Sequence, residues 1–297
     1  MLRVTLLIVH FVELLLYTWL VHDSAVEGPL DWFVEVIGLA LVVRLIIIFL
    51  TFVLARTPLQ PLVISFSALA SEYVSALYIF SFSALRSMPE AFTPTHTNPN
   101  HLPILFIHGF TCNAGFWRKF IAVLQPQWGA RLATISLEPV HASIDDYATR
   151  IEQRMDELLA ASDSRRCLVV AHSMGGLAIR QALRSAQTRG KVAGVVTLGT
   201  PHLGTRLADF SLAENSHQMR RHSDWLDQLR RDEKAYELPP FEALVGTHDN
   251  IVSPQQNAVF ESGTNTYMTG ISHLAMALNE QVIDWTLDRC ARLAAQA

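Results

Sequence analysis

Charge is scarce in this sequence, and the shortage is concentrated at one end. Only 17% of the 297 residues are charged, compared with about 25% in an ordinary soluble domain. Residues 1–88 hold four Arg and six Asp or Glu, so 10 of the 50 charged residues, and the other 40 fall in the remaining 209. The positive mean hydropathy of the chain therefore comes mainly from its first 88 residues.

Lysine and cysteine are also scarce. Three lysines and a net charge of −4 argue against nucleic-acid binding, because phosphate contacts require clustered cations. A chain that is 50% hydrophobic is not a disordered one. The cysteines are Cys112, Cys167 and Cys290. They are too few for a disulfide framework, and their spacing is not that of metal ligands. We therefore expect no metal site.

Three long apolar runs occupy the first 88 residues and predict a bundle of about three transmembrane helices. They lie near residues 4–21, 33–55 and 62–85, and each is close to the ~20 residues that cross about 30 Å of hydrocarbon. The first run could instead be a cleaved signal peptide, although no small-x-small cleavage site follows it. The serine-rich third run could instead lie in the membrane interface, although its small residues at every fourth position suit close helix packing.

Positive charges predict the orientation of this segment. Arg3 precedes the first run and Arg56 lies between the second and the third, whereas residues 22–32 hold acids but no Lys or Arg. Because cytoplasmic loops carry the excess of Lys and Arg, the N-terminus is expected inside. With three spans everything after residue 88 lies outside the membrane, and with two spans it is cytoplasmic. We expect the external location, although Arg86 opposes it.

Each apolar run carries a charge near its centre: Glu13 in the first, Arg44 in the second and Glu72 in the third. A lone charge at that depth costs roughly 2.5–3.5 kcal/mol on insertion scales. Opposite charges at one depth can offset this cost. Our hypothesis is that Arg44 pairs with Glu13, Glu72 or both and holds the helices together; the alternative is that each charge reaches the interface separately.

The pattern changes after a polar, proline-rich linker at residues 89–101. Short apolar runs alternate with amphipathic segments across residues 102–297, which predicts an α/β domain with a mostly parallel, doubly wound sheet. The expected strands are 102–107, 131–137, 167–171, 192–198, 241–245 and 265–268, and the expected helices are 114–124, 143–161, 177–186 and 279–295.

A candidate nucleophile lies where one of these strands turns into a helix. Residues 171–175, Ala-His-Ser-Met-Gly, form a small-x-Ser-x-Gly elbow around Ser173. Ala171 and Gly175 are small because the sharp turn leaves no room for side chains two positions from the serine. The alternative is a glycine-rich helix start with an incidental serine.

A serine hydroxyl needs a base, and the base needs an orienting acid. His273 follows the last expected strand, and Asp249 ends the strand before it. We therefore expect Ser173, Asp249 and His273 to form a catalytic triad. Other His and Asp residues are weaker candidates, because no suitably placed strand precedes them or because they precede the expected acid. They are His202, His217, His222, His248, Asp209, Asp224 and Asp227.

An oxyanion that develops during ester attack needs two backbone N–H donors. One is expected at Met174, directly after the nucleophile, and the other at Phe110, directly after the first strand. Gly109 permits a close approach of the chain there. His108 is expected to be a structural hydrogen-bonding residue rather than a second base.

Four features together resemble the α/β-hydrolase superfamily, specifically the bacterial triacylglycerol lipases and esterases. They are His-Gly-Phe at residues 108–110, Trp117, the elbow with Gly176 after it, and Leu-Gly-Thr-Pro-His-Leu-Gly-Thr at residues 198–205. The resemblance covers about residues 102–295. It implies an α/β-hydrolase fold and a carboxylic-ester hydrolase that uses no cofactor and forms an acyl-enzyme on Ser173.

Two departures from this pattern bear on function. Ala171 replaces the commoner glycine of the elbow, and an apolar segment precedes the domain. The second departure indicates a membrane-anchored lipase or esterase that acts on acyl lipids, including phospholipids or lysophospholipids, rather than a secreted enzyme. The expected partners are a lipid or acyl-ester substrate and the bilayer. The expected location is the bacterial inner membrane, with the catalytic domain on the external, periplasmic side.

Residues 205–238 lack strand character and predict an amphipathic helix after Ser223. An insert beside the elbow could cover the acyl pocket as a lid, or it could be an ordinary surface helix. Other functions also remain open. The same triad could transfer an acyl group or hydrolyse a thioester, and a degenerate domain could serve only in membrane interactions.

Overall fold

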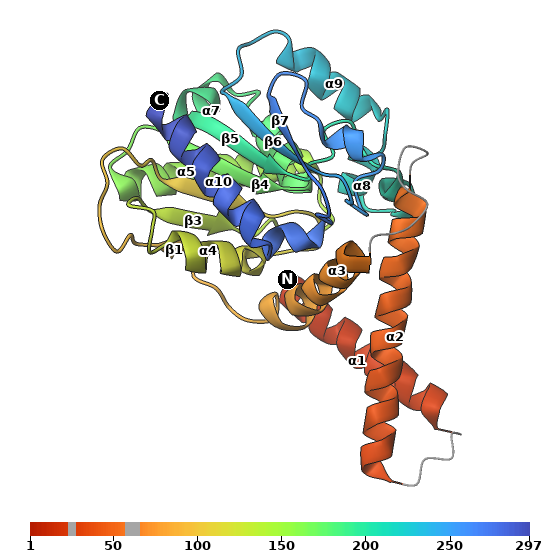
Figure 1. Cartoon of the computed structure of the whole chain (residues 1–297). Coiled ribbons are helices and arrows are strands. Elements are labelled where there is room, and N and C mark those ends of the chain that lie inside the picture. Colours follow the sequence, from red (N-terminus) through yellow and green to blue (C-terminus); the bar gives the residue numbers. More distant parts are fainter. Residues whose placement is uncertain (23–27, 57–65) are drawn as a thin grey trace.

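The computed structural model describes residues 1–22, 28–56 and 66–297, and Figure 1 shows two parts. An α/β domain holds most of the chain, and the N-terminal helices extend away from it. The expected loops between the apolar runs lie mostly outside the described residues, as does the start of the third run at residues 62–65.

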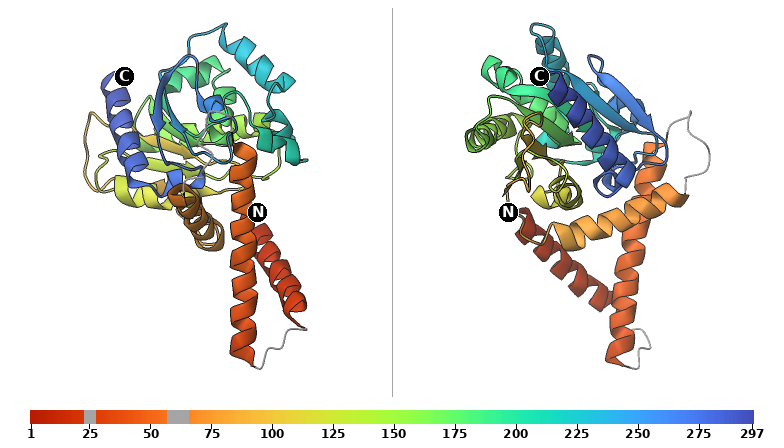
Figure 2. Two further views of the ribbon diagram at one scale, coloured as in Figure 1. Left: turned by 45° about the vertical axis from the view of Figure 1, so that its right-hand side comes forward. Right: turned by 60° about the vertical axis from the view of Figure 1, so that its left-hand side comes forward.

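The first two apolar runs form long helices. α1 (Leu2–Val21) has 20 residues and α2 (Pro29–Ala55) has 27, which is enough to cross the hydrocarbon core of a bilayer. Only 11% of the most apolar window of each helix is buried inside the protein. Figure 2 shows both helices extending away from the domain. Both helices are therefore long, apolar and exposed, and they are candidate membrane spans.

The third run differs from the expected span. Its described part forms α3 (Phe66–Tyr78), which has 13 residues and continues into a π-helical turn at Ile79–Ser83. Ala68, Glu72 and Ser75 lie on one face of this helix and are buried. The expectation of about three spans is not confirmed, because the described residues contain two candidate spans and α3 packs on the α/β domain instead.

The mid-span charges are only partly paired as expected. The Arg44 guanidinium forms an ion pair with the Glu13 carboxylate, at 2.5 Å between Nη2 and Oε2, and also donates to the backbone oxygen of Ala40. This pair joins α1 to α2. Of the two partners that the hypothesis allowed, Glu13 is confirmed. The Glu72 carboxylate instead binds backbone N–H groups of the α/β domain.

The α/β domain contains a seven-stranded sheet in the order β1-β3-β2-β4-β5-β6-β7. All neighbours pair in parallel except β1, which is antiparallel to β3 and lies within the expected linker. The strands are β1 (Ala91–Phe92), β2 (Ile104–Ile107), β3 (Leu132–Ile135), β4 (Cys167–His172), β5 (Val192–Leu198), β6 (Phe241–Gly246) and β7 (Thr264–Met268).

Helices cover both faces of this sheet, and alternate strand residues therefore enter two different cores. Leu105 and Val169 pack with α5 and α6, whereas Phe106 and Val170 pack with α4 and α10. Ser143 caps α5, since its side chain accepts from the N–H of Asp145 in the first turn of that helix. The helices are α4 (Arg118–Leu124), α5 (Ile144–Ser162), α6 (Met174–Ala182), α7 (Ala186–Lys191), α8 (Glu214–Gln218), α9 (Asp224–Glu233) and α10 (Glu280–Ala295).

The N-terminal helices contact the domain at the edge where the parallel strands end. The Asn250 amide, after β6, donates to the Thr51 hydroxyl on α2, and the side chains of Ser253 and Gln255 donate to the last carbonyl of that helix. The N-terminal ammonium pairs with Glu138, after β3, at 2.6 Å. Residues that follow β3, β6 and β7 thus all meet the N-terminal segment, and this edge carries the candidate site.

Candidate active site

The elbow has the strained backbone that its sequence predicts. Ser173, between β4 and α6, has φ +53° and ψ −127°. Residues other than glycine rarely adopt this backbone conformation. A Cβ at Gly175 would lie 2.6 Å from the carbonyl oxygens of Ile107 and His108, so no side chain fits there. This tight packing of the turn against the end of β2 places the serine at the carboxyl edge of the sheet.

Ser173, His273 and Asp249 are brought into one hydrogen-bonded series. The His273 Nε2 atom lies 3.0 Å from the Ser173 hydroxyl, and its Nδ1 atom lies 2.8 Å from Asp249 Oδ2. The three side chains come from the ends of β4, β6 and β7 and are all buried. The geometry suits a serine nucleophile, a histidine base and a carboxylate that fixes the imidazole tautomer.

The surroundings of His273 favour its protonated form. Burial alone would lower the pKa of the imidazole, but the charge and hydrogen bond of Asp249 together with the charge of Glu72 outweigh burial, and the pKa is raised above 6.5. The other oxygen of Asp249 accepts the N–H groups of Ile251 and Val252 at 2.8 and 2.7 Å. The carboxylate is thus fixed from both sides and stabilises an imidazolium when one forms.

The two expected oxyanion donors follow neighbouring strands. β2 and β4 are paired with Ile107 opposite Ala171, so Phe110 and Met174 both lie just beyond the same edge. A Cβ at Gly109 would be 2.7 Å from the Ser173 Cβ atom. The loop that carries the Phe110 N–H is therefore adjacent to the nucleophile, which only a glycine at position 109 permits.

Two residues beside His273 were not among the sequence-based candidates. The His172 ring lies 4.5 Å from the His273 ring, and its Nε2 atom is 3.2 Å from the His273 carbonyl oxygen. Burial holds the pKa of His172 well below 6.5, so this ring stays neutral and supports the loop. The side-chain oxygen of Asn250, Oδ1, accepts the backbone N–H of His273 at 3.3 Å. His172 directly precedes Ser173 and Asn250 directly follows Asp249, and this adjacency is the feature of the sequence that could have identified them as site residues.

The remaining histidine candidates lie elsewhere. His108 has the expected structural role: its Nε2 accepts the Leu137 N–H at 2.9 Å, and burial lowers its pKa to about 4. His248 accepts the Gly270 N–H at 3.0 Å. Residues 217 and 222 lie in and after α8, and neither is part of the triad geometry.

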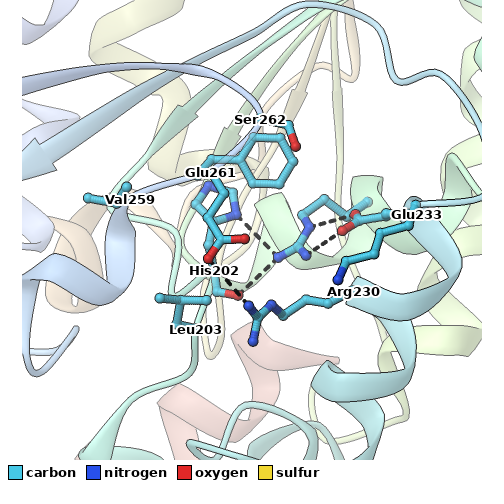
Figure 3. Close-up of a pocket in the computed structure, with 10 residues that line it drawn as sticks. His202, Leu203, Arg230, Glu233, Val259, Glu261 and Ser262 are labelled. Carbon is cyan, nitrogen blue, oxygen red and sulfur yellow. Dashed lines mark hydrogen bonds and ion pairs between the residues drawn. The ribbon is translucent and has the colours of Figure 1, made fainter.

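His202, from the Gly-Thr-Pro-His stretch, lines a small separate cavity (Figure 3). Its carbonyl oxygen accepts from Arg180, whose guanidinium also binds both carboxylate oxygens of Glu233 at 2.7 and 2.8 Å. None of the triad residues lines this cavity. The ion pair between Arg180 and Glu233, which lines this cavity, joins α6 to α9.

The predicted amphipathic helix in residues 205–238 is confirmed as α9. The Ser223 side chain caps it by accepting the Leu226 N–H, Leu226 and Leu229 are buried, and the Trp225 indole donates to Asp145 on α5. Its apolar face therefore packs on the domain.

Within the described ranges, no group of three His, Cys, Asp or Glu side chains could hold a metal ion.

Known proteins provide independent comparisons. A triacylglycerol lipase from Pseudarthrobacter phenanthrenivorans is 31% identical over 117 residues, which are 36% of this chain and 35% of the lipase. One from Burkholderia plantarii has the same identity over 36% and 32%. The aligned part is thus about a third of each lipase.

Solved structures and a family model extend the match. The mature Bacillus licheniformis lipase BlEst2 aligns with TM-score 0.60 and 18% identity over 67% of this chain and 96% of its own. Aspergillus fumigatus lipase B aligns with TM-score 0.61 and 15% identity, over 96% and 89%. These likenesses show the fold, and the model described as the alpha/beta hydrolase family matches residues 104–296. The chain therefore belongs to the α/β-hydrolase family.

Proposed function

We propose that this protein is a membrane-anchored serine hydrolase that cleaves carboxylic esters of acyl lipids. The observation that carries this proposal is the hydrogen-bonded series from Asp249 through His273 to Ser173, with separations of 2.8 and 3.0 Å. The names of two relatives, both triacylglycerol lipases, support the same class of substrate. In this proposal residues 1–88 are the anchor, residues 102–297 are the catalytic domain, and residues 205–238 border the acyl pocket.

The proposed chemistry follows from the roles of these groups. Ser173 attacks the ester carbonyl while His273 takes its proton, and the Phe110 and Met174 N–H groups hold the oxyanion. The alcohol leaves with the proton from His273, which leaves an acyl group on the serine. Water then attacks this acyl-enzyme with the same histidine as base. Asp249 keeps the imidazole oriented and stabilises its charged form.

The position of the anchor supports a lipid as substrate. α2 and α3 contact the loops that carry Asp249 and His273, so the carboxyl edge of the sheet faces the helices that would enter the bilayer. An ester dissolved in the membrane would reach this edge without crossing much water. A long-chain lipid ester is therefore the better substrate than a small soluble ester.

Replacing the nucleophile tests the proposal. We expect Ser173→Ala to lower ester hydrolysis by roughly 10⁴-fold or more and to abolish labelling by a fluorophosphonate. The matched control is Ser164→Ala, which makes the same change just before β4, where the hydroxyl donates to the Arg166 carbonyl. A panel of esters of increasing chain length is assayed with the full chain in lipid vesicles. Equal activity of Ser173→Ala and wild type would contradict the proposal.

A further inference from the structure

α3 places a buried carboxylate against the segment that carries His273. Glu72 is 1% exposed, and its Oε2 atom accepts the N–H groups of Leu274 and Ala275 at 2.8 and 3.1 Å. These are the two residues directly after the histidine. A side chain more than 200 positions earlier in the sequence therefore fixes the backbone on one side of His273.

The residue before His273 is held by the same helix. The Ser272 hydroxyl donates to the Ala68 carbonyl at 3.3 Å and lies 3.4 Å from the Ser71 hydroxyl. α3 thus holds residues on both sides of the histidine, and the N-terminal segment forms part of the wall behind the triad.

The charge of Glu72 also acts on the imidazole. Among the described residues, four groups face His273: Asp249 after β6, His172 at the end of β4, Ser173 directly after that strand, and Glu72 from α3. His172 stays neutral because burial lowers its pKa. After Asp249, the Glu72 carboxylate is the further group that raises the pKa of His273.

A merely space-filling role does not account for a charge at this position. Burying a carboxylate is costly. An apolar residue of similar size would avoid that cost but would leave the N–H groups of Leu274 and Ala275 without their acceptor. Burial raises the pKa of Glu72, and a charged His273 opposes that rise. Each charge therefore favours the other, and their attraction is greatest when an imidazolium forms.

We infer that Glu72 is a positioning residue for His273, so that seating of the N-terminal segment completes the active site. This inference rests on the proposed hydrolase function. It means that the anchor both holds the domain at the membrane and supports the base. Release of α3 from the domain would switch the enzyme off without altering Ser173, Asp249 or His273.

The test compares two replacements in the full-length, membrane-inserted protein. Glu72→Gln keeps the size and removes the charge; we expect kcat to fall about tenfold with KM unchanged, and the acid limb of kcat/KM to move down by about half a pH unit. Glu72→Asp keeps the charge but shortens the side chain. We expect a lower kcat, with the acid limb of kcat/KM near its wild-type pH. The control is Tyr73→Phe, which loses a hydrogen bond to the Leu41 carbonyl on α2 and should change neither value.

The possible results separate the inference from the function beneath it. Loss of kcat in both variants without a shift of the acid limb in Glu72→Gln would overturn the inference in favour of a purely structural role. Kinetics equal to those of Tyr73→Phe would overturn it as well. If Glu72→Gln does not fold, Glu72→Asp decides: a lower kcat at constant KM supports the inference, and a wild-type kcat overturns it. Activity that is independent of Ser173 would instead overturn the proposed function.

Discussion

The charge state of His273 links the structure of the site to the pH at which it works. The imidazole must be neutral to accept the serine proton, and Asp249 raises its pKa above 6.5 despite burial. A raised pKa keeps the base protonated to a higher pH. We therefore expect the acid limb of kcat/KM, which reports the free enzyme, to have its midpoint above pH 6.5.

Asp249→Asn should move that limb to lower pH and lower kcat by roughly 10⁴-fold, because the imidazolium loses its counter-charge and its tautomer is no longer fixed. Asp288→Asn, on the exposed side of α10, is the matched control and should leave the profile unchanged. A limb that stays in place in Asp249→Asn would show that the aspartate does not set the pKa of His273.

The sequence pointed to the residues of the site that follow strands, and it missed those that reach the site through space. Ser173, Asp249 and His273 were accessible because parallel strands end at one edge, so strand prediction alone places the residues after them together. Glu72 has no such signal, since it lies in an apolar run far from the domain in the sequence. Its contacts with Leu274 and Ala275 arise only when α3 is docked.

At the scale of elements, a buried ion pair joins α6, which begins at the nucleophile, to α9. The Arg180 side chain is 2% exposed and that of Glu233 is 9% exposed. Arg180→Met would leave the glutamate buried without its partner, at a cost of about 3–5 kcal/mol, and should lower the thermal midpoint of the full chain by roughly 10 °C.

Two companion variants make this prediction specific. The double change Arg180→Met and Glu233→Met should recover most of the lost stability, because no charge then remains buried. Arg184→Met breaks the more exposed pair between Arg184, just after α6, and Asp232 on α9 and should cost about 0–1 kcal/mol. If Arg180→Met is as mild as Arg184→Met, α9 is not held by this pair, and a mobile cover becomes the better interpretation of the region.

Element prediction succeeded where burial on both faces produced apolar runs, which are unbroken in β2 and interrupted by a single polar residue in β5 (Thr197) and β6 (Glu242). It failed for β1, whose two residues are too few to show any period. For the third apolar run it predicted a helix but did not identify what surrounds that helix, because hydropathy reports that a helix avoids water and not whether lipid or protein replaces the water. The buried face of α3 meets the α/β domain, and the serines at every fourth position suit that contact as well as a membrane one.

At the scale of the whole molecule, the number of spans decides where catalysis takes place. The external location expected for the catalytic domain depended on three spans. α1 and α2 alone return the chain to the side on which it begins, and the ion pair between the N-terminal ammonium and Glu138 places the two on one side. Arg3 and Arg56 border the ends of these helices nearest the domain, whereas the far end is acidic. Because cytoplasmic segments carry the excess of arginine, a catalytic domain in the cytoplasm is the better prediction.

Cysteine accessibility tests this orientation with the full chain. The three native cysteines are buried, and burial raises the pKa of Cys112 and of Cys167 to about 12, so their thiols should react slowly. In intact bacterial cells, a membrane-impermeant maleimide should label Leu30→Cys, at the far end of α2, within minutes. Gln296→Cys, on the exposed end of α10, should be labelled only after the cells are opened. The reverse pattern would place the active site outside, and it would require a third crossing between Ala55 and the domain, where α2 and α3 now share contacts with the same sheet edge.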